Sequence, residues 1–135
     1  MKELSLLATI DNLPTVLAFL EEQLEEADCP LKTQMRLAVA AEEIFVNIAS
    51  YAYAPDTGMA TVRVERREDP KTIYVTFIDS GMPFDPLLKE DPDVTLPAEE
   101  REIGGLGIYM TKQAMDEVTY EYRDGQNILT LVKKL

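Results

Sequence analysis

The chain has 135 residues, which suits one domain with its own hydrophobic core and leaves no room for a second domain. Its 25 acidic and 13 basic side chains give a net charge of −12, which argues against a polyanion such as nucleic acid as a partner. The sequence contains no histidine, and this excludes histidine-activated nucleophiles, histidine metal sites and autophosphorylation on histidine.

The cysteine content and hydropathy of the sequence bear on where the protein works. The single Cys29 cannot form an internal disulfide, which fits a reducing compartment. No charged-then-apolar leader opens the chain, and no apolar run reaches the roughly 18 residues that cross a bilayer. We therefore expect a cytoplasmic protein without a membrane partner.

The first predicted elements are a strand and a helix. Apolar and polar residues alternate over residues 3–10, which indicates a strand whose buried face is formed by Leu4, Leu6, Ala8 and Ile10. From about Leu13 to Leu24, apolar residues recur at helical spacing while glutamates occupy the opposite face. We interpret the glutamates as a solvated surface.

The second predicted helix spans about residues 31–51 and is unusual in composition. Two apolar stripes follow it, formed by Leu37, Ala41, Ile44 and Ile48 and by Ala38, Phe45 and Ala49. This helix should therefore be buried on most sides. At 100° per residue, a narrow polar strip remains, formed by Arg36, Glu43, Asn47 and Ser50. Such a strip should line a cleft or join a satisfied network, because an unpartnered buried carboxylate is costly.

The second half of the chain predicts two hairpins separated by a loop and a helix. Strands are expected at about residues 61–65, 73–79, 118–122 and 127–132, and a helix at about residues 106–115. Between them, about residues 82–104 are rich in proline and acids without an apolar period, which is typical of a lid or binding loop. This order predicts an α+β fold in which helices pack on one face of a mixed, mostly antiparallel sheet within a single domain, residues 1–135.

Three groups of residues suggest chemistry. Asp79 ends a strand before Gly81, and this is either a turn cap or a carboxylate that accepts a hydrogen bond from the amine of adenine. Glu43 and Asn47 form either a polar seam or a base beside a ligand for Mg²⁺. Residues 104–107 are either a hinge or a phosphate-binding helix start, and they match neither the Rossmann nor the P-loop motif.

In this order, the three groups resemble the motifs of the GHKL ATPase superfamily. Residues 43–47 are similar to its N box, residues 79–85 to its first glycine box and residues 104–107 to its second. The small size, the short lid and the Pro-Phe-Asp ending of the first box look most like the anti-sigma-factor serine/threonine kinases. The resemblance implies a two-layer α/β sandwich of the Bergerat type, an ATP lid over about residues 82–104, and ATP and Mg²⁺ as cofactors.

The resemblance also implies roles for individual residues. Glu43 would be the catalytic base. Asn47 would be the metal ligand and would bind the nucleotide through Mg²⁺. Asp79 would contact adenine with help from Gly81. The remaining expected nucleotide contacts are Gly104, Gly105, Leu106 and Gly107 near the phosphates and Thr130 beside the adenine.

The function implied by this subfamily is phosphorylation of a STAS-domain anti-anti-sigma protein, together with binding of a sigma factor. The subfamily also implies a homodimer, and the first strand could pair at a sheet edge with a second copy. Two departures keep an alternative open, because Ser50 and Tyr51 stand where many relatives have a histidine, and the second glycine box lacks an arginine found in some relatives. The alternative is a catalytically weak ATP-binding module whose nucleotide state only gates partner binding. A stray GHKL ATPase or a fragment of a histidine kinase is a third possibility, although no histidine acceptor exists here.

Overall fold

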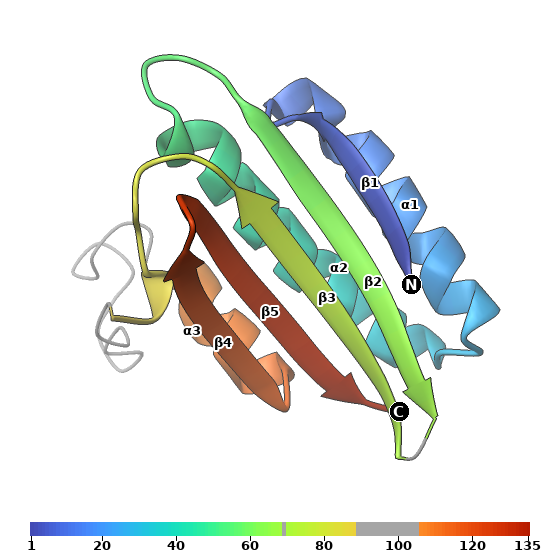
Figure 1. Ribbon diagram of the computed structural model, residues 1–135. Coiled ribbons are helices and arrows are strands. Elements are labelled where there is room, and N and C mark those ends of the chain that lie inside the picture. Colours follow the sequence, from blue (N-terminus) through green and yellow to red (C-terminus); the bar gives the residue numbers. More distant parts are fainter. Residues whose placement is uncertain (69, 89–105) are drawn as a thin grey trace.

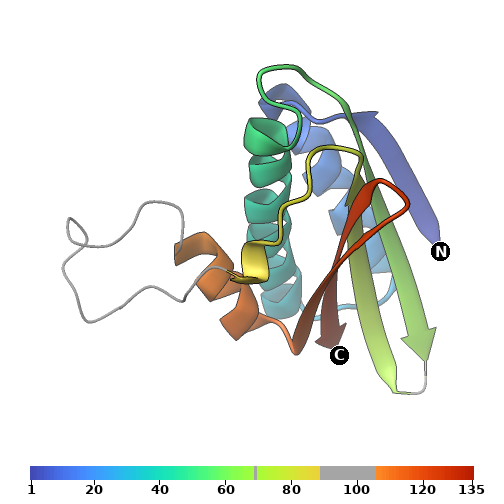
Figure 2. The same ribbon diagram turned by 60° about the vertical axis from the view of Figure 1, so that its left-hand side comes forward.

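The computed structural model describes residues 1–68, 70–88 and 106–135 (Figure 1). Its sheet contains β1 (Lys2–Leu7), β2 (Met59–Glu68), β3 (Lys71–Asp79), β4 (Glu117–Arg123) and β5 (Gln126–Lys134). The strands lie in the order β1-β2-β3-β5-β4, and each described pairing is antiparallel. The helices are α1 (Leu13–Glu26), α2 (Leu31–Asn47) and α3 (Leu106–Ala114). Figure 2 shows the sheet nearly edge-on with the helices on one face, which confirms the predicted α+β architecture.

The core lies between this helical layer and the inward face of the sheet. Residues alternate along each strand, so β3 directs Val75 and Phe77 toward the helices while their neighbours face outward. From the helices, Leu20 of α1 and Leu37 and Phe45 of α2 complete this core at 1% exposure or less. The predicted glutamates of α1 are exposed, which confirms that they form a solvated surface.

The first strand is shorter than its alternating pattern predicts. Leu7 pairs with Met59, the first residue of β2, so the ladder has no further strand partner. Ala8 still donates a 2.8 Å hydrogen bond to the carbonyl of Gly58, and a 3-10 turn then begins at Ile10. The prediction that Ile10 belongs to the buried face is therefore wrong, because its side chain is 52% exposed.

Helix α2 matches its predicted inner stripe but is not buried on most sides. The stripe Leu37, Ala41, Ile44 and Ile48 is buried. In contrast, Leu31, Met35 and Val39 are between 59% and 73% exposed, because the other helices leave this side of α2 open. No helix in the described ranges combines the length and apolar character that a membrane span requires.

The end of α2 widens into a π-helical turn, η2 (Ile48–Ala52). Such turns are rare and occur frequently at functional sites. Strands β4 and β5 are joined by Asp124 and Gly125, both at positive φ, 54° and 78°. This confirms the predicted tight turn, in which glycine adopts the left-handed conformation readily.

Candidate functional site

A pocket of about 480 Å³, including its open mouth, lies between the end of α2 and the inward face of the sheet. Its walls are mostly apolar and are formed by Ile44, Ile48, Ala52, Phe77, Met82, Phe84, Pro86 and Leu129. A few polar side chains converge on the same space, namely Asn47, Asp79, Tyr120 and Asn127. An apolar cavity with a few placed polar groups is the usual form of a small-molecule site.

Asp79 lies at the end of β3 with its side chain turned inward and only 6% exposed. Its Oδ1 accepts hydrogen bonds of 2.9 Å from the backbone N–H of Gly81 and from Nδ2 of Asn127. Within the described part of the chain, both hydrogen bonds to this carboxylate fall on Oδ1. Oδ2 is therefore the atom that can accept a hydrogen bond from a ligand in the pocket.

The segment after β3 is hydrogen-bonded to the π-helical turn and to the residue that follows it. Met82 donates a 2.9 Å backbone hydrogen bond to the carbonyl of Ala52. A Cβ at Gly81 would fall 2.2 Å from that same carbonyl oxygen, so the close approach requires glycine. The Tyr53 hydroxyl adds a second link, since it accepts from the N–H of Ser80 at 2.7 Å. The first glycine box is thus held against the end of α2.

Asn127 connects the parts of this site by hydrogen bonds, although no role for it is predicted from the sequence. Its Nδ2 donates to Asp79 and, also at 2.9 Å, to the carbonyl of Met82. Its Oδ1 accepts from the N–H of Phe84 at 3.2 Å and from the Tyr120 hydroxyl. One signal was present: asparagine is a poor strand former, yet it sits near the start of β5, directly opposite Asp79.

The surroundings of Tyr120 favour the protonated form of its hydroxyl. Burial raises the pKa of the Tyr120 hydroxyl above its ordinary value of 10.0, and the backbone of Phe84 offsets part of this increase. The negative charges of Asp85 and Asp79 raise this pKa further. Tyr120 therefore remains a hydrogen-bond donor to Asn127 throughout the neutral range.

A second group of predicted residues meets where α2 faces the start of α3. Glu43 and Asn47 lie one turn apart and half-buried, and Asn47 Nδ2 donates to Glu43 Oε1 at 3.3 Å. A Cβ at Gly107 would fall 2.2 Å from Glu43 Cδ, so this carboxylate lies against the backbone of the first turn of α3. The structure thus brings Glu43, Asn47 and Gly107 together, with Asn47 also lining the pocket.

Of the four predicted phosphate contacts, Gly107 is the one that the structure describes in full. Gly104 and Gly105 lie outside the described residues, as does most of the predicted lid. Leu106 opens α3, and only its backbone is described. The described ranges contain no cluster of three or more His, Cys, Asp or Glu side chains that could hold a metal on its own. A metal at Asn47 would therefore depend on ligand oxygens, as is usual for Mg²⁺ bound to phosphates.

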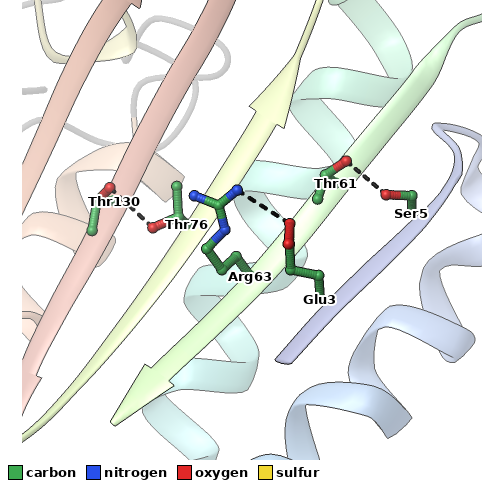
Figure 3. Close-up of polar contacts among 6 residues, drawn as sticks. All are labelled: Glu3, Ser5, Thr61, Arg63, Thr76 and Thr130. Atoms are coloured by element: carbon green, nitrogen blue, oxygen red, sulfur yellow. Dashed lines mark hydrogen bonds and ion pairs between the residues drawn. The ribbon is translucent and has the colours of Figure 1, made fainter. Parts of the chain in front are cut away.

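Thr130 lies on the opposite face of the sheet from the pocket. Its hydroxyl is 3.2 Å from that of Thr76, among the outer-face contacts drawn in Figure 3. Because side chains alternate along β5, Asn127 and Leu129 point inward and Thr130 points outward. The structure therefore does not bring Thr130 to the site expected for adenine, and it places Asn127 there instead.

The chain is similar to a family of ATPase domains and to named protein kinases. Residues 6–133 match the family described as histidine kinase-like ATPase domain. The chain is 27% identical over 100 residues to the serine/threonine-protein kinase BtrW of Bordetella bronchiseptica, covering 74% of this chain and 70% of BtrW. It is 30% identical over 97 residues to the serine-protein kinase RsbW of Bacillus cereus, covering 69% of this chain and 59% of RsbW.

A solved structure shares the fold. The crystal structure of the RsbU and RsbW domains of a Mycobacterium tuberculosis protein matches with a TM-score of 0.65 at 19% identity. That match covers 100% of this chain and 33% of the other. It agrees with the antiparallel sheet and one-sided helical layer described above. Since the family match extends over residues 6–133, nearly the full length, the chain belongs to the histidine kinase-like ATPase domain family.

Proposed function

We propose that this protein is an ATP-dependent serine/threonine kinase that phosphorylates a STAS-type anti-anti-sigma protein. The observation that carries the proposal is the meeting of Glu43, Asn47 and Gly107 beside a pocket that contains Asp79. Relatives named as serine and serine/threonine protein kinases support the reaction type. The chain spans 59% of the length of the RsbW relative, so substrate and partner remain part of the proposal.

The pocket is suited to an adenine base. Its apolar walls can enclose a flat ring, and Oδ2 of Asp79 can accept a hydrogen bond from the exocyclic amine. Asn127 fixes which oxygen of Asp79 is available, because its Nδ2 occupies Oδ1 together with the Gly81 N–H. A base with a carbonyl at the position of the amine would present an acceptor to this carboxylate and bind less well.

The arrangement of α2 and α3 is suited to phosphoryl transfer. Asn47 uses Nδ2 for Glu43, so its Oδ1 is the atom that would hold Mg²⁺. When bound, Mg²⁺ supplies positive charge that neutralises the phosphates. The first turn of α3, at Gly107, supplies backbone N–H groups for phosphate oxygens.

The proposed transfer uses Glu43 as the base. The acceptor hydroxyl gives its proton to the Glu43 carboxylate while its oxygen forms a bond to the γ-phosphorus. The bond between that phosphorus and the β,γ-bridging oxygen breaks, and ADP leaves with the electron pair. A base of this kind contributes about 10²- to 10⁴-fold to the rate.

A second candidate is an ATP-binding module that controls a partner such as a sigma factor without efficient transfer. One contact favours it, because Glu43 Oε1 already accepts a hydrogen bond from Asn47, so the second oxygen, Oε2, would have to take the proton. In that case, nucleotide would set the conformation near α3, and that conformation would decide which partner is held.

The two candidates are separated by incubating the protein with labelled ATP, Mg²⁺ and STAS-domain proteins from the same genome. We expect label on a STAS protein, a loss of about 10²-fold or more in Glu43→Gln, and normal nucleotide binding in that variant. Glu42→Gln is the matched control, since Glu42 is the exposed neighbour of Glu43. Asn47→Ala should lose Mg²⁺-dependent binding. Tight ATP binding without any phosphoprotein would favour the second candidate.

A further inference from the structure

The outward side of α2 carries an apolar ridge that the described residues leave uncovered. Leu31, Met35 and Val39 recur every four residues and are 73%, 63% and 59% exposed. Residues at this spacing form one continuous row along a helix. The same row winds on to Glu43 and Asn47, turning about 40° around the helix at each step, so the exposed apolar residues lead toward the proposed catalytic pair.

A groove lies beside this ridge, between α2 and α3. It encloses about 660 Å³, including open space, and is lined by Met35 and Val39 on one side and by Met110 and Ala114 on the other. Met110 is itself 53% exposed. Methionine side chains are flexible and polarisable, which suits surfaces that adapt to a partner. Exposed apolar side chains gathered in this way mark interaction surfaces.

The groove leads toward the proposed site of phosphoryl transfer. Val39 lies one turn before Glu43 on α2, about 6 Å along the helix at 1.5 Å per residue. On α3, Met110 lies three residues after Gly107, which contacts the Glu43 carboxylate. A polypeptide segment lying in the groove would therefore have one end within reach of that carboxylate.

The charges at the groove indicate what kind of partner it accepts. Among the described residues, the lining of this groove contains Arg36 and no carboxylate, although the whole chain has a net charge of −12. On the other side of the ridge, the acidic lining residue is Glu21, which borders Leu31 and Met35 from α1. Residues 31–41 of α2 hold Lys32 and Arg36 and no acidic residue. A second copy docked symmetrically across this ridge would bring Arg36 toward Arg36, which is repulsive. A different protein with acidic side chains around an apolar segment is complementary.

We infer that the α2 ridge and the adjoining groove dock an apolar, acid-flanked segment of the protein substrate, and that this docking delivers the acceptor hydroxyl to Glu43. The inference rests on the proposed kinase function and adds the surface that selects the substrate. It assigns Met35 and Met110 to protein recognition and gives them no part in nucleotide binding, because neither lines the nucleotide pocket.

The experiment compares Met35→Glu and Met110→Glu with Met59→Glu, a matched control. Met59 is 51% exposed and lies on β2, so the same charge is introduced at similar exposure away from the ridge. Three quantities are measured for each protein: the Kd for a fluorescent ATP analogue, the Kd for a STAS-domain protein of the same genome, and the rate of phosphorylation of that protein. Sedimentation velocity records the oligomeric state.

We expect Met35→Glu and Met110→Glu each to weaken binding of the STAS protein and to raise the KM for that protein by about tenfold or more, the size typical of a disrupted interface anchor. The Kd for the ATP analogue should not change, and Met59→Glu should match the wild type throughout. Unchanged STAS binding and phosphorylation in Met35→Glu and Met110→Glu would overturn the docking inference without contradicting the proposed kinase function. A change in sedimentation alone would identify a self-association surface and would also overturn it.

The same measurements distinguish failure of the proposed function. If the wild type binds the STAS protein without phosphorylating it, the kinase proposal fails, and the binding constants of the variants still decide whether the ridge docks the partner. If the wild type neither binds nor phosphorylates any STAS-domain protein of the genome, the kinase proposal fails and the docking inference falls with it.

Discussion

Removing the Asn127 side chain tests the assignment of the base-recognition site. Asn127→Ala deletes hydrogen bonds to the buried Asp79 and to the backbone of Met82 and Phe84. At about 1 kcal/mol for each neutral bond and about 1.5–3 kcal/mol for the bond to a carboxylate, the sum is about 3.5–5 kcal/mol. Water can replace part of this loss at Phe84, which is 53% exposed. We therefore expect unfolding to become easier by about 2–4 kcal/mol.

The effect on nucleotide binding is expected to exceed the effect of a general loss of stability. A domain of this size is stable by about 5–15 kcal/mol, so Asn127→Ala should still fold and allow its ATP affinity to be measured. With Asp79 no longer oriented, we expect ATP binding to weaken by about 10- to 100-fold and discrimination between ATP and GTP to decrease. Calorimetric titration with both nucleotides measures this, and urea unfolding followed by circular dichroism measures stability.

Thr130→Val is the control for this prediction. Thr130 is three residues along the same strand, but its hydroxyl contacts Thr76 on the outer face of the sheet. We expect a change of less than about 1 kcal/mol in stability and no change in ATP affinity. The reasoning would be refuted if Thr130→Val weakened ATP binding more than Asn127→Ala did, because the residue expected from the family resemblance would then be the one that contacts the base.

A charge substitution at the same position adds a prediction with a defined sign. Asn127→Asp would place a carboxylate oxygen about 2.9 Å from Asp79 Oδ1, where the amide now donates. Two carboxylates at this distance repel by about 6 kcal/mol at an effective dielectric constant of 20, so they retain a proton between them at low pH. That proton restores one hydrogen bond. ATP affinity of the variant should therefore improve as the pH falls from about 8 to about 6, and a flat pH profile would contradict the geometry.

Three further predictions concern close contacts and a buried thiol. Gly81→Ala should cost about 2 kcal/mol or more in urea unfolding, because its Cβ would meet the rigid backbone of Ala52, and unchanged stability would contradict the loop geometry. In Gly107→Ala, the nearest atoms that the new Cβ meets are at the end of the flexible Glu43 side chain, so phosphorylation should fall by about tenfold or more while stability stays within about 1 kcal/mol. Burial raises the pKa of the Cys29 thiol, with Lys71 opposing in part, so at neutral pH this cysteine should react slowly with a thiol reagent until the protein unfolds, and fast native labelling would disprove this.

The sequence predicts the elements well because their periods reflect burial on one face. The inner stripe of α2 and the strand ending at Asp79 both follow this rule. The end of β1 could not be predicted in the same way, since a strand ends where its partner ends. The alternating pattern continues to Ile10, but β2 begins opposite Leu7, and the chain turns there.

The part of the site that could be predicted from the sequence is the part that depends on local spacing. Glu43 and Asn47 belong to one helix, and their mutual placement follows from a four-residue spacing that needs no tertiary information. The orientation of the Thr130 side chain depends on which residues of β5 face the helices, and an offset of one residue reverses the face of every side chain. The contact of Asn127 with Asp79 depends on the pairing of β5 with β3, which no local pattern in the sequence fixes.

Helix α2 and the turn that continues it connect every part of the proposed function. Its exposed ridge, represented by Met35, comes first, and Glu43 and Asn47 follow two and three turns later. The π-helical turn then accepts the hydrogen bond of Met82 through Ala52 and so holds the loop that shapes the base pocket. One continuous helix carries these contacts. Backbone hydrogen bonds within the helix therefore set the position of the adenine relative to Glu43, the proposed catalytic base. A docked substrate on the ridge would therefore be aligned with a nucleotide in the pocket through the helix itself.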